Sequence, residues 1–319
     1  MYYNIRIKGT GFTANLRHQR RFLRQEEKTM SVRINREQLV MQSVMGRVHH
    51  PTIWHGNHFK LIHTGESVVL PSVGGITYNV RIGDSVYGMA CDHVEPGVSL
   101  KNPDRDENDA VVTLACVGNE AVVISGEARG EKGRVTGFHG GIDHTLLYFP
   151  QKTLEKLLPG DAILIRAVGQ GMQIAGFPDV LCTNLDPDLF DLLGIEQKDG
   201  RLQVPVAAVV PPHLMGAGQG EGSGFTGDYD IMTADRDEVE RCGLNRLRYG
   251  DLVLLQDCDN TYGRGFLRGA VSIGVVVHSD CGMMGHGPGV TTLLTCKTPE
   301  IEGVITPRAN LADLWGITL

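Results

Sequence analysis

The sequence has no long apolar run, no excess of basic charge and no paired cysteines. No apolar stretch reaches the ~18 residues that a membrane-spanning helix needs, and no signal peptide opens the chain. A net charge of −7 argues against a general nucleic-acid binder, which needs a basic face. The seven cysteines are scattered and include no CxxC pair, which favours reduced thiols over a disulfide framework. We therefore expect a cytoplasmic protein that binds neither nucleic acid nor membranes.

Glycine, in contrast, is abundant, with 41 residues in a chain of 319. Together with short runs of Val, Ile and Leu, so many glycines indicate tight turns and bulges between strands. An apolar share of 41% and a charged share of 21% are typical of a globular protein. The length allows one large domain or two medium ones. We predict a mainly β fold with short helices and only a minor α+β character.

The first 29 residues differ from the rest, because they carry seven Lys and Arg against two Glu. Met30 reads like an alternative start. Residues 1–29 are then a disordered basic arm or a start-site artefact; the alternative is an arm that joins an oligomer or contacts an anion. Residues 30–319 are expected to form the β-rich globular region. A loose break near residues 170–200 allows two intertwined subdomains.

Apolar periodicity and turn residues predict the elements. Apolar positions at near-helical spacing predict a helix over 36–45. Strands are expected over 67–70, 76–82, 110–117, 121–124, 133–137, 146–148, 161–168, 202–210, 251–256, 269–277 and 290–295. Further helical turns are expected over 151–158, 186–193, 235–241 and 310–315. Asp186 is the expected N-cap of its helix, with Pro187 at the first position.

Asp92, His93 and Glu95 follow a short apolar run. In extended backbone, residues 93 and 95 share a face while 92 points away. Carboxylate oxygens beside an imidazole nitrogen suit a divalent metal ion or a general base. The alternative is a polar turn that Asp92 caps and Pro96-Gly97 reverses.

His139, Asp143 and His144 surround a pair of glycines, Gly140 and Gly141. The glycines let the backbone approach a ligand closely. The carboxylate can orient the imidazole beside it, or both can bind a metal ion. The alternative is an ordinary hairpin in which the two glycines make the turn.

A glycine-rich loop covers residues 213–230. Gly218, Gly220 and Gly222 offer backbone amides to an anion or an oxyanion, and Glu221 between them is a candidate general acid/base. The loop lacks the Lys-Ser/Thr ending of a P-loop and the strand and long helix of a Rossmann fingerprint. A flexible surface loop is the alternative to a lid or a site wall.

Asp257 and Asp259 alternate at the end of a predicted strand, which would place both carboxylates on one face. Such a pair shares a cation or raises the pKa of one member. The spacing is not that of an EF-hand. Arg264 follows as a candidate anchor for a substrate carboxylate, and a structural salt bridge is the alternative.

The most informative segment follows a buried apolar strand that is predicted to end at residue 277. His278 and Asp280 alternate, so both are expected to point to one side. Gly285-His286-Gly287 then predicts a tight turn with exposed amides. Cys281 would need a base and an electropositive setting to act as a nucleophile, and we assign it no catalytic role.

Three stretches resemble a bacterial and archaeal family known only as a domain of unknown function. They are Asp92-His-Val-Glu-Pro-Gly-Val, the segment from Gly269 to Asp280, and Gly285-His-Gly-Pro-Gly-Val-Thr-Thr. The resemblance covers most of the chain from about Met30. It implies a β-rich fold with barrel-like parts, and it brings no activity with it.

A weaker similarity is to the acetamidase/formamidase family, metal-dependent hydrolases of small amides. Gly140-Gly-Ile-Asp143 followed by Tyr148-Phe-Pro150, and later Gln219-Gly-Glu221-Gly-Ser, are similar to elements of that family. The Asn of its first element is missing here, and the elements lie further apart. The similarity implies amidase chemistry only by analogy of fold.

Together these patterns predict a metal-dependent hydrolase of a small polar substrate, such as an amide or a cyclic amide. Because imidazoles are plentiful, Zn²⁺ or Mn²⁺ is expected rather than Ca²⁺. The expected ligands are His93, Asp143, His144, His278, Asp280 and His286. The expected substrate groups are Glu221 as acid/base, Arg264 as anchor, and the amides of Gly218, Gly220, Gly222, Gly285 and Gly287.

Two alternatives from other classes stay open. One is a binding module for an anionic metabolite without turnover, which would use the amides of residues 216–224 and 285–289. The other is a self-assembling structural protein that uses the basic arm. Besides a small molecule, the expected partner is a further copy of the chain in a homo-oligomer.

Overall fold

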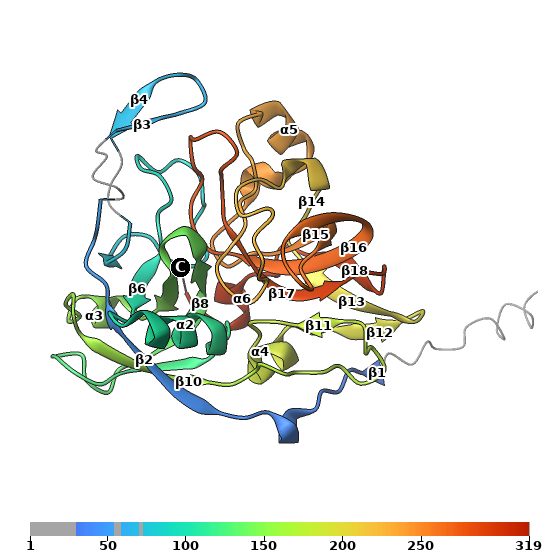
Figure 1. The fold of residues 1–319 in the computed structure, drawn as a ribbon, viewed down its shortest axis with the longest axis horizontal. Helices are drawn as coiled ribbons and strands as arrows, with labels where there is room; N and C mark the ends of the chain where they lie inside the picture. Colours follow the sequence, from blue (N-terminus) through green and yellow to red (C-terminus); the bar gives the residue numbers. More distant parts are fainter. Residues whose placement is uncertain (1–29, 54–58, 70–72, 319) are drawn as a thin grey trace, which may run out of the picture.

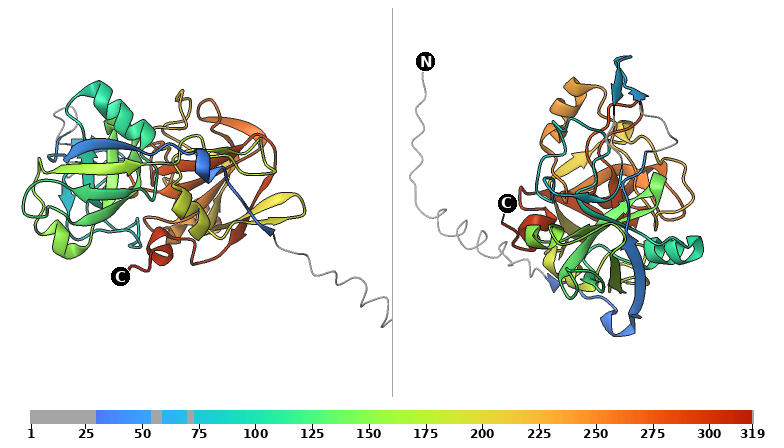
Figure 2. Two further views of the ribbon diagram at one scale, coloured as in Figure 1. Left: turned by 90° about the horizontal axis from the view of Figure 1, so that it is seen from below. Right: turned by 90° about the vertical axis from the view of Figure 1, so that its left-hand side faces the viewer.

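The computed structural model describes residues 30–53, 59–69 and 73–318. The predicted mainly β fold with short helices and a barrel-like part is confirmed, since six strands form a closed barrel. Figure 2 shows the strands of the first half, apart from β1 (Met30–Ser31), in blue and green as one lobe beside the yellow-to-red strands of the second half. The predicted basic arm over residues 1–29 lies outside the described residues.

The barrel is built from antiparallel strands of the first half of the chain. In spatial order they are β2 (Gln42–Val48), β10 (Ala162–Ala167), β7 (Glu120–Val123), β8 (Lys132–His139), β9 (His144–Tyr148) and β6 (Gly97–Lys101). β6 pairs back with β2, with Val48 opposite Leu100, and this closes the ring. The short β5 (Ile76–Thr77) also pairs with β6.

A five-stranded sheet forms the centre of the second half. Its order is β11 (Leu181–Cys182), β17 (Val290–Cys296), β16 (Gly265–Val276), β15 (Leu252–Asp259) and β14 (Ala208–Val210). A second sheet has the order β1 (Met30–Ser31), β12 (Glu196–Lys198), β13 (Arg201–Val206) and β18 (Ile301–Ile305). The hairpin of β3 (Phe59–Leu61) and β4 (Ser67–Val69) extends from the first half at the top left of Figure 1.

The helices are short. They are η1 (Arg36–Gln38), α2 (Arg105–Leu114), η3 (Gly140–Ile142), α3 (Gln151–Leu154), α4 (Pro187–Leu192), η4 (Pro212–Leu214), α5 (Arg236–Arg241), η5 (Leu244–Arg246) and α6 (Leu311–Leu314). The Asp186 side chain accepts from backbone N–H groups at the start of α4, with Pro187 in the first turn, as predicted. Among the described residues, no helix combines the length and the apolar character that crossing a membrane requires.

The predicted helix over 36–45 is wrong, because residues 39–41 are in neither helix nor strand and residues 42–45 are the start of β2. Only Arg36–Gln38 is helical, as one 3-10 turn. In β2 the buried side chains alternate with exposed ones, and Val44 and Val48 point inward. The apolar residues that suggested a helix include Met41 and Met45, which are exposed.

The predicted strand over 110–117 is also wrong, since its first half is the end of helix α2. Asp104 caps that helix by accepting from the N–H of Glu107. Asn108, Val111 and Val112 are its buried residues, at i, i+3 and i+4. The apolar run therefore forms one face of a helix rather than a buried strand.

Asp257 and Asp259 do not share a face, because a bulge in β15 interrupts the alternation between them. Asp257 has a left-handed backbone, with φ 54°, and its carboxylate accepts from the N–H of Gly269 at 2.8 Å. Asp259 accepts from the Thr261 hydroxyl at 2.6 Å. Both carboxylates thus stabilise turns, and they are not placed to share the predicted cation.

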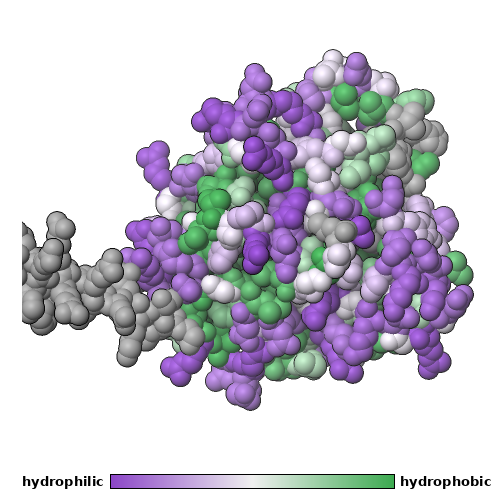
Figure 3. Space-filling model, turned by 180° about the vertical axis from the view of Figure 1, so that it is seen from behind, coloured by the Kyte–Doolittle hydropathy of each residue, from purple (hydrophilic) through white to green (hydrophobic). Residues whose placement is uncertain are grey.

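One continuous hydrophobic core joins the two halves. It includes barrel residues such as Leu100 and Ile163 and second-half residues such as Leu293, all fully buried. At the junction, Gly137 of β8 approaches Val277 so closely that a Cβ would lie 2.1 Å from the Val277 side chain. On the face in Figure 3, hydrophilic and hydrophobic residues are interspersed. Because the core continues across the junction, side chains that project into the junction are held by packing from both halves.

Candidate metal centre

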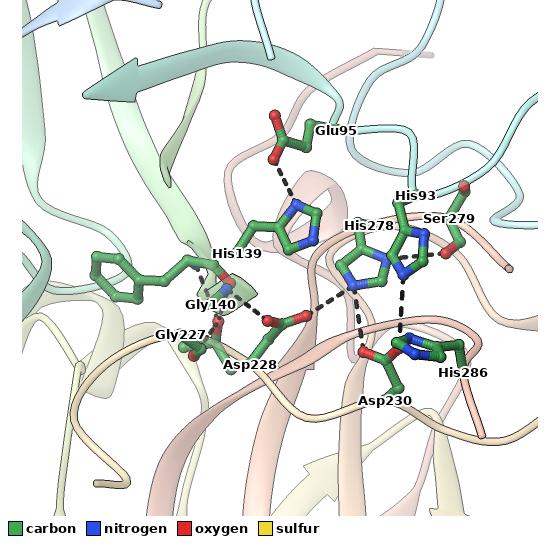
Figure 4. A network of polar contacts seen from close by, with 12 residues as sticks. His93, Glu95, His139, Gly140, Gly227, Asp228, Asp230, His278, Ser279 and His286 are labelled. Atoms are coloured by element: carbon green, nitrogen blue, oxygen red, sulfur yellow. Dashed lines mark hydrogen bonds and ion pairs between the residues drawn. The ribbon is translucent and has the colours of Figure 1, made fainter. Parts of the chain in front are cut away.

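A cavity of about 370 Å³ lies where the barrel meets the second half. Its polar wall is made by Asp92 and His93, the β8–β9 hairpin, the 213–230 loop and His286. The histidine–aspartate cluster consists of five residues of this wall, His93, His139, Asp228, Asp230 and His286, together with His278 behind them (Figure 4).

The β8–β9 hairpin places His139 and His144 opposite each other, as the last residue of β8 and the first of β9. Buried Glu95 accepts from Nδ1 of His139 at 2.5 Å and from Nδ1 of His144 at 2.9 Å. Burial raises the pKa of Glu95, but these two imidazoles outweigh burial and hold it well below its ordinary value. Glu95 therefore fixes His139 with Nδ1 protonated, which leaves Nε2 for a ligand.

His144 lies behind the cluster and connects it to a further imidazole. Its Nε2 is 3.1 Å from Nδ1 of His49, and because His144 donates to Glu95 through Nδ1, its Nε2 is the acceptor. Burial, and after it the neighbouring imidazole of His144, lowers the pKa of His49 to about 4. His49 therefore stays neutral at physiological pH.

Acid is expected to destabilise the fold through His49. Its folded pKa of about 4 lies below the unfolded value of about 6.5, so the unfolded state binds more protons and stability falls as pH drops from 6.5 to 4. His49 is partly exposed, so solvent screening limits the loss to about 1–2 kcal/mol. Urea unfolding at pH 7.5 and 4.5 should show a smaller loss for His49→Gln, which retains a donor for His144. Equal losses in the two proteins would contradict this.

Asp228 and Asp230 project from the opposite wall. An isolated bridge pairs Asp230 with Gly289, so this segment is extended beside the start of β17. Alternation along extended backbone puts the two carboxylates on one side and Tyr229 on the other, and both point toward the imidazoles in Figure 4. The N–H of Gly140 donates to Asp228 Oδ1 at 2.7 Å, which fixes that carboxylate further.

His278 is fully buried at the centre of the cluster. Its Nδ1 donates to the carbonyl of Ser279 at 2.9 Å, so in the neutral ring Nε2 carries the lone pair. That Nε2 lies 2.7 Å from Asp228 Oδ2 and 3.4 Å from Asp230 Oδ1. The short contact lacks hydrogen-bond alignment, and both Nε2 and Asp228 Oδ2 are buried without a hydrogen-bond partner in the described chain. With a proton on Nε2, the two groups form a buried ion pair, and a metal ion would compete with that proton.

His93 enters the cluster from a strained backbone, with φ 50°. Asp92 accepts from its Nδ1 at 2.9 Å, and Asp92 is itself held by Cys281 Sγ at 3.0 Å and by the N–H of Gly282 at 2.8 Å. Burial, reinforced by Asp92, raises the pKa of Cys281, which is therefore a protonated donor. Nε2 of His93 faces the cluster, 3.7 Å from Asp230 Oδ2.

Three imidazoles thus share one arrangement. In His93, His139 and His278, Nδ1 donates to a fixed acceptor, and one potential ligand atom of each ring lies within 4.8 Å of the others. Proteins orient metal-ligating histidines with such hydrogen bonds. Asp228 and Asp230 form a second set of the same size with His278. The cluster therefore has the ligand number and orientation for a divalent ion.

The carboxylates of the cluster are negatively charged at neutral pH. Burial raises the pKa of Asp230, but the imidazoles of His278, His286 and His93 outweigh it and hold the pKa well below its ordinary value. Burial also raises the pKa of Asp228, and the charge of His278 brings it below the ordinary value. Burial lowers the pKa of His278, whereas the two carboxylates raise it well above its ordinary value. Protons and metal ions would compete for this cluster.

Gly289 has no side chain, so Asp228 and His278 can occupy the space beside its backbone. A Cβ at this position would lie 2.0 Å from Asp228 Oδ2 and 2.3 Å from Nε2 of His278. We expect Gly289→Ala to weaken Zn²⁺ affinity at least about 10–100-fold, as displaced supporting groups do, in competition with a chromophoric chelator. Gly265→Ala is the matched control, because its Cβ would meet no atom within 4 Å. Unchanged affinity in Gly289→Ala would contradict a site here.

Three of the six predicted ligands lie in the cluster. His93 and His278 have been described, and Nδ1 of His286 lies 2.8 Å from Asp230 Oδ2. His144 lies one layer behind, where it contacts the carboxylate that orients a cluster imidazole. It is a supporting residue in this arrangement.

Asp143 and Asp280 lie apart from the cluster. Asp143 lines the cavity, but its side chain is 62% exposed and lies 3.9 Å from Lys101 Nζ. Asp280 accepts from the Thr233 hydroxyl and from Arg236, and lines a second cavity. It does not point with His278, because β16 has ended before this segment and strand alternation no longer applies.

The predicted anchor Arg264 lines the cavity and is 5% exposed. Its Nη2 donates to the Thr226 carbonyl, and its Nε is buried without a partner among the described residues. Burial lowers the pKa of Arg264, and the Asp228 carboxylate opposes that effect. Glu221 lies at the exposed rim of the cavity, and its carbonyl accepts from the N–H of Arg264.

The glycine amides are mostly engaged within the protein. N–H groups of residues 216, 217, 219, 220 and 221 donate to backbone carbonyls, so an open nest of successive amides does not form there. Gly218 lines the cavity, and Gly222 is exposed. Gly285 accepts from a loop amide through its carbonyl. A Cβ on Gly287 would lie 1.8 Å from the Ile231 carbonyl, so this glycine serves close packing.

The predicted ligand list omits four residues of the site: Glu95 and His139, which belong to segments that the sequence singled out, and Asp228 and Asp230. The Asp-x-Asp alternation at 228–230 was a usable signal. The same pattern at 257–259 does not place its two carboxylates on one face, because a bulge interrupts the strand. Only strand pairing distinguishes these two Asp-x-Asp segments.

Comparison with known proteins identifies the family. Residues 59–191 match the N-terminal part, and residues 192–315 the C-terminal part, of the family described as Domain of unknown function (DUF4438). The chain belongs to this family, in agreement with the resemblance in its sequence. The crystal structure of TM1086 is similar, with 47% identity and a TM-score of 0.84, over 88% of this chain and 98% of that one. No curated protein matches, so the weaker similarity to acetamidases gains no support.

Proposed function

We propose that the protein is a metal-dependent hydrolase of a small polar substrate, such as an amide or a cyclic amide. The observation that carries this proposal is the oriented set of His93, His139 and His278, whose Nδ1 atoms contact fixed acceptors and whose rings lie close together. Proteins orient metal-ligating histidines with such hydrogen bonds, and a bound ion would displace the proton that pairs His278 with Asp228. His93, His139 and Asp230 complete the donor set.

The donor set favours Zn²⁺ or Mn²⁺. Three imidazole nitrogens with two carboxylates suit these ions, whereas Ca²⁺ prefers oxygen ligands throughout. A bound ion of this kind supplies an acidified water and polarises a carbonyl group. Glu221, at the exposed rim, can exchange protons between the cavity and solvent.

The cavity favours a small anionic substrate. Its volume of about 370 Å³ lies at the lower end of the roughly 300–1,000 Å³ of ligand pockets. Apolar side chains such as Phe138 and Met283 line it beside Arg264. A guanidinium binds a carboxylate through paired hydrogen bonds. We therefore expect a substrate that carries a carboxylate near the amide bond.

Metal analysis followed by an amide panel tests the proposal. The purified chain is loaded with Zn²⁺ or Mn²⁺ and incubated with linear and cyclic amides, each with and without a carboxylate. We expect ion-dependent release of the amine or opening of the ring, with preference for the carboxylated compounds. Absence of any bound ion would overturn the proposal. Binding of the compounds without turnover would favour the alternative of a non-catalytic module for an anionic metabolite.

Replacing Arg264 tests the anchor separately. Arg264→Lys retains the charge but loses the paired hydrogen bonds. We expect KM for a carboxylated amide to rise on the order of 10–100-fold, equivalent to about 1.5–3 kcal/mol for a charged hydrogen bond, with little change for its uncharged analogue. Arg268→Lys is a matched control outside the cavity lining. An equal effect on both substrates would assign Arg264 a structural role.

A further inference from the structure

We propose that the cluster holds two metal ions and that the Asp230 carboxylate bridges them. This inference rests on the proposed function and specifies its active centre. The first ion would be held by His278, Asp228 and Asp230 Oδ1, with His139 beside them. The second would be held by Asp230 Oδ2, His286 and His93.

The two oxygens of Asp230 face different imidazoles. Oδ1 lies 3.4 Å from Nε2 of His278. Oδ2 lies 2.8 Å from Nδ1 of His286 and 3.7 Å from Nε2 of His93. One carboxylate thus contacts nitrogens on both of its sides, as a bridging ligand does. Asp230 is 5% exposed, so its charge is balanced by these neighbours rather than by bulk solvent.

Two of the separations are close to those between ligands of one ion. With bonds of about 2.1 Å, neighbouring ligand atoms lie roughly 3.0–3.4 Å apart in octahedral or tetrahedral geometry. The distances from Asp230 to His278 and His93, 3.4 and 3.7 Å, are long for hydrogen bonds and close to this range. His286 has the shortest contact, 2.8 Å, and by itself this contact would also fit a hydrogen bond.

The compact ligand sets place His93 between the two groups of histidines. His93 belongs to one compact set with His139 and His278, and to another with His286 and Cys281. Cys281 donates to Asp92 and its pKa is raised, so it supports His93 through Asp92 rather than acting as a ligand. In known two-metal sites the ions lie about 3.5–4 Å apart and together stabilise attacking and leaving groups.

The number of ions per chain tests the inference directly. We expect two Mn²⁺ per wild-type chain by elemental analysis after removal of free ion, and an exchange-coupled spectrum in electron paramagnetic resonance. His286→Ala is expected to retain one ion and give the spectrum of isolated Mn²⁺. Asp230→Asn should lose the coupling as well. His213→Ala is the control, since His213 is exposed and pairs with Glu238, and it should retain two ions.

The outcomes separate this inference from the proposed function. One ion per wild-type chain, unaffected by His286→Ala, would overturn the second site and leave a single-ion hydrolase. Two ions that persist and remain coupled in both variants would overturn the assignment of Asp230 as the bridge. No bound ion in the wild type would overturn both proposals. Circular dichroism of His286→Ala, whose side chain is 29% exposed, confirms that a lost ion does not reflect a lost fold.

Discussion

Asp228→Asn is expected to lose its metal ion and to lower kcat/KM at least about 100-fold, because changing even an outer partner of a metal ligand costs 10–100-fold. Asp228 Oδ2 faces His278 at 2.7 Å, while Oδ1 accepts from the N–H of Gly140. An asparagine amide retains the Gly140 contact through its oxygen. Its NH₂ group can donate to Nε2 of neutral His278, so the buried contact is retained without the charges of the ion pair.

This variant should therefore fold normally while losing the ligand. Metal content by elemental analysis and turnover of a carboxylated amide are measured together with thermal unfolding of the metal-free protein. Asp143→Asn is the matched control, because Asp143 lines the same cavity but lies outside the cluster. It should retain the ion. Full metal content in Asp228→Asn would remove Asp228 from the ligand set.

Chelation is expected to lower the unfolding temperature of the wild-type protein by about 5–10 °C. A ligand that binds only the native state at 100 times its Kd stabilises it by about 2.7 kcal/mol, and each kcal/mol shifts Tm by roughly 2–4 °C in a domain of this size. The ion would also relieve repulsion between Asp228 and Asp230, which are both buried and ionised.

Differential scanning calorimetry with and without a chelator measures the shift. Gly289→Ala is expected to show a much smaller shift, since its Cβ would occupy the space of the ligand atoms. Gly265→Ala should behave as wild type does. The metal-loaded sample contains the ion well above micromolar concentration. If that sample and the chelated sample have the same Tm, a native-state metal site is contradicted.

Local signals in the sequence predicted local structure well. Asp186 and Pro187 predicted the start of α4 because capping involves only neighbouring backbone groups. The β-branched run before His278 predicted β16, because β-branched side chains favour strands. A short apolar run can fit both helical and strand periodicity, and there the prediction failed. Residues 110–114 belong to a helix that begins at the Asp104 cap.

Part of the site could also be predicted from the sequence. The segments around His93, His139–His144 and His278–His286 were each predicted to be functional, because polar side chains and glycines follow predicted strands there. Which residues of these segments meet was not predictable. Asp280 and Asp143 are close in sequence to cluster histidines, yet Asp280 points to a second cavity and Asp143 to the cavity mouth.

The sequence by itself determined a β-rich chain, most of its strands, the N-cap of α4, its family and the residue types available for chemistry, since these depend on composition and on neighbours along the chain. Only the tertiary structure decided that Asp228 and Asp230 face His278 while Asp257 and Asp259 hold turns. The physical reason is that a metal centre needs ligand atoms within a few ångströms, and strand pairing, bulges and the closure of the barrel set those distances between segments far apart in the chain.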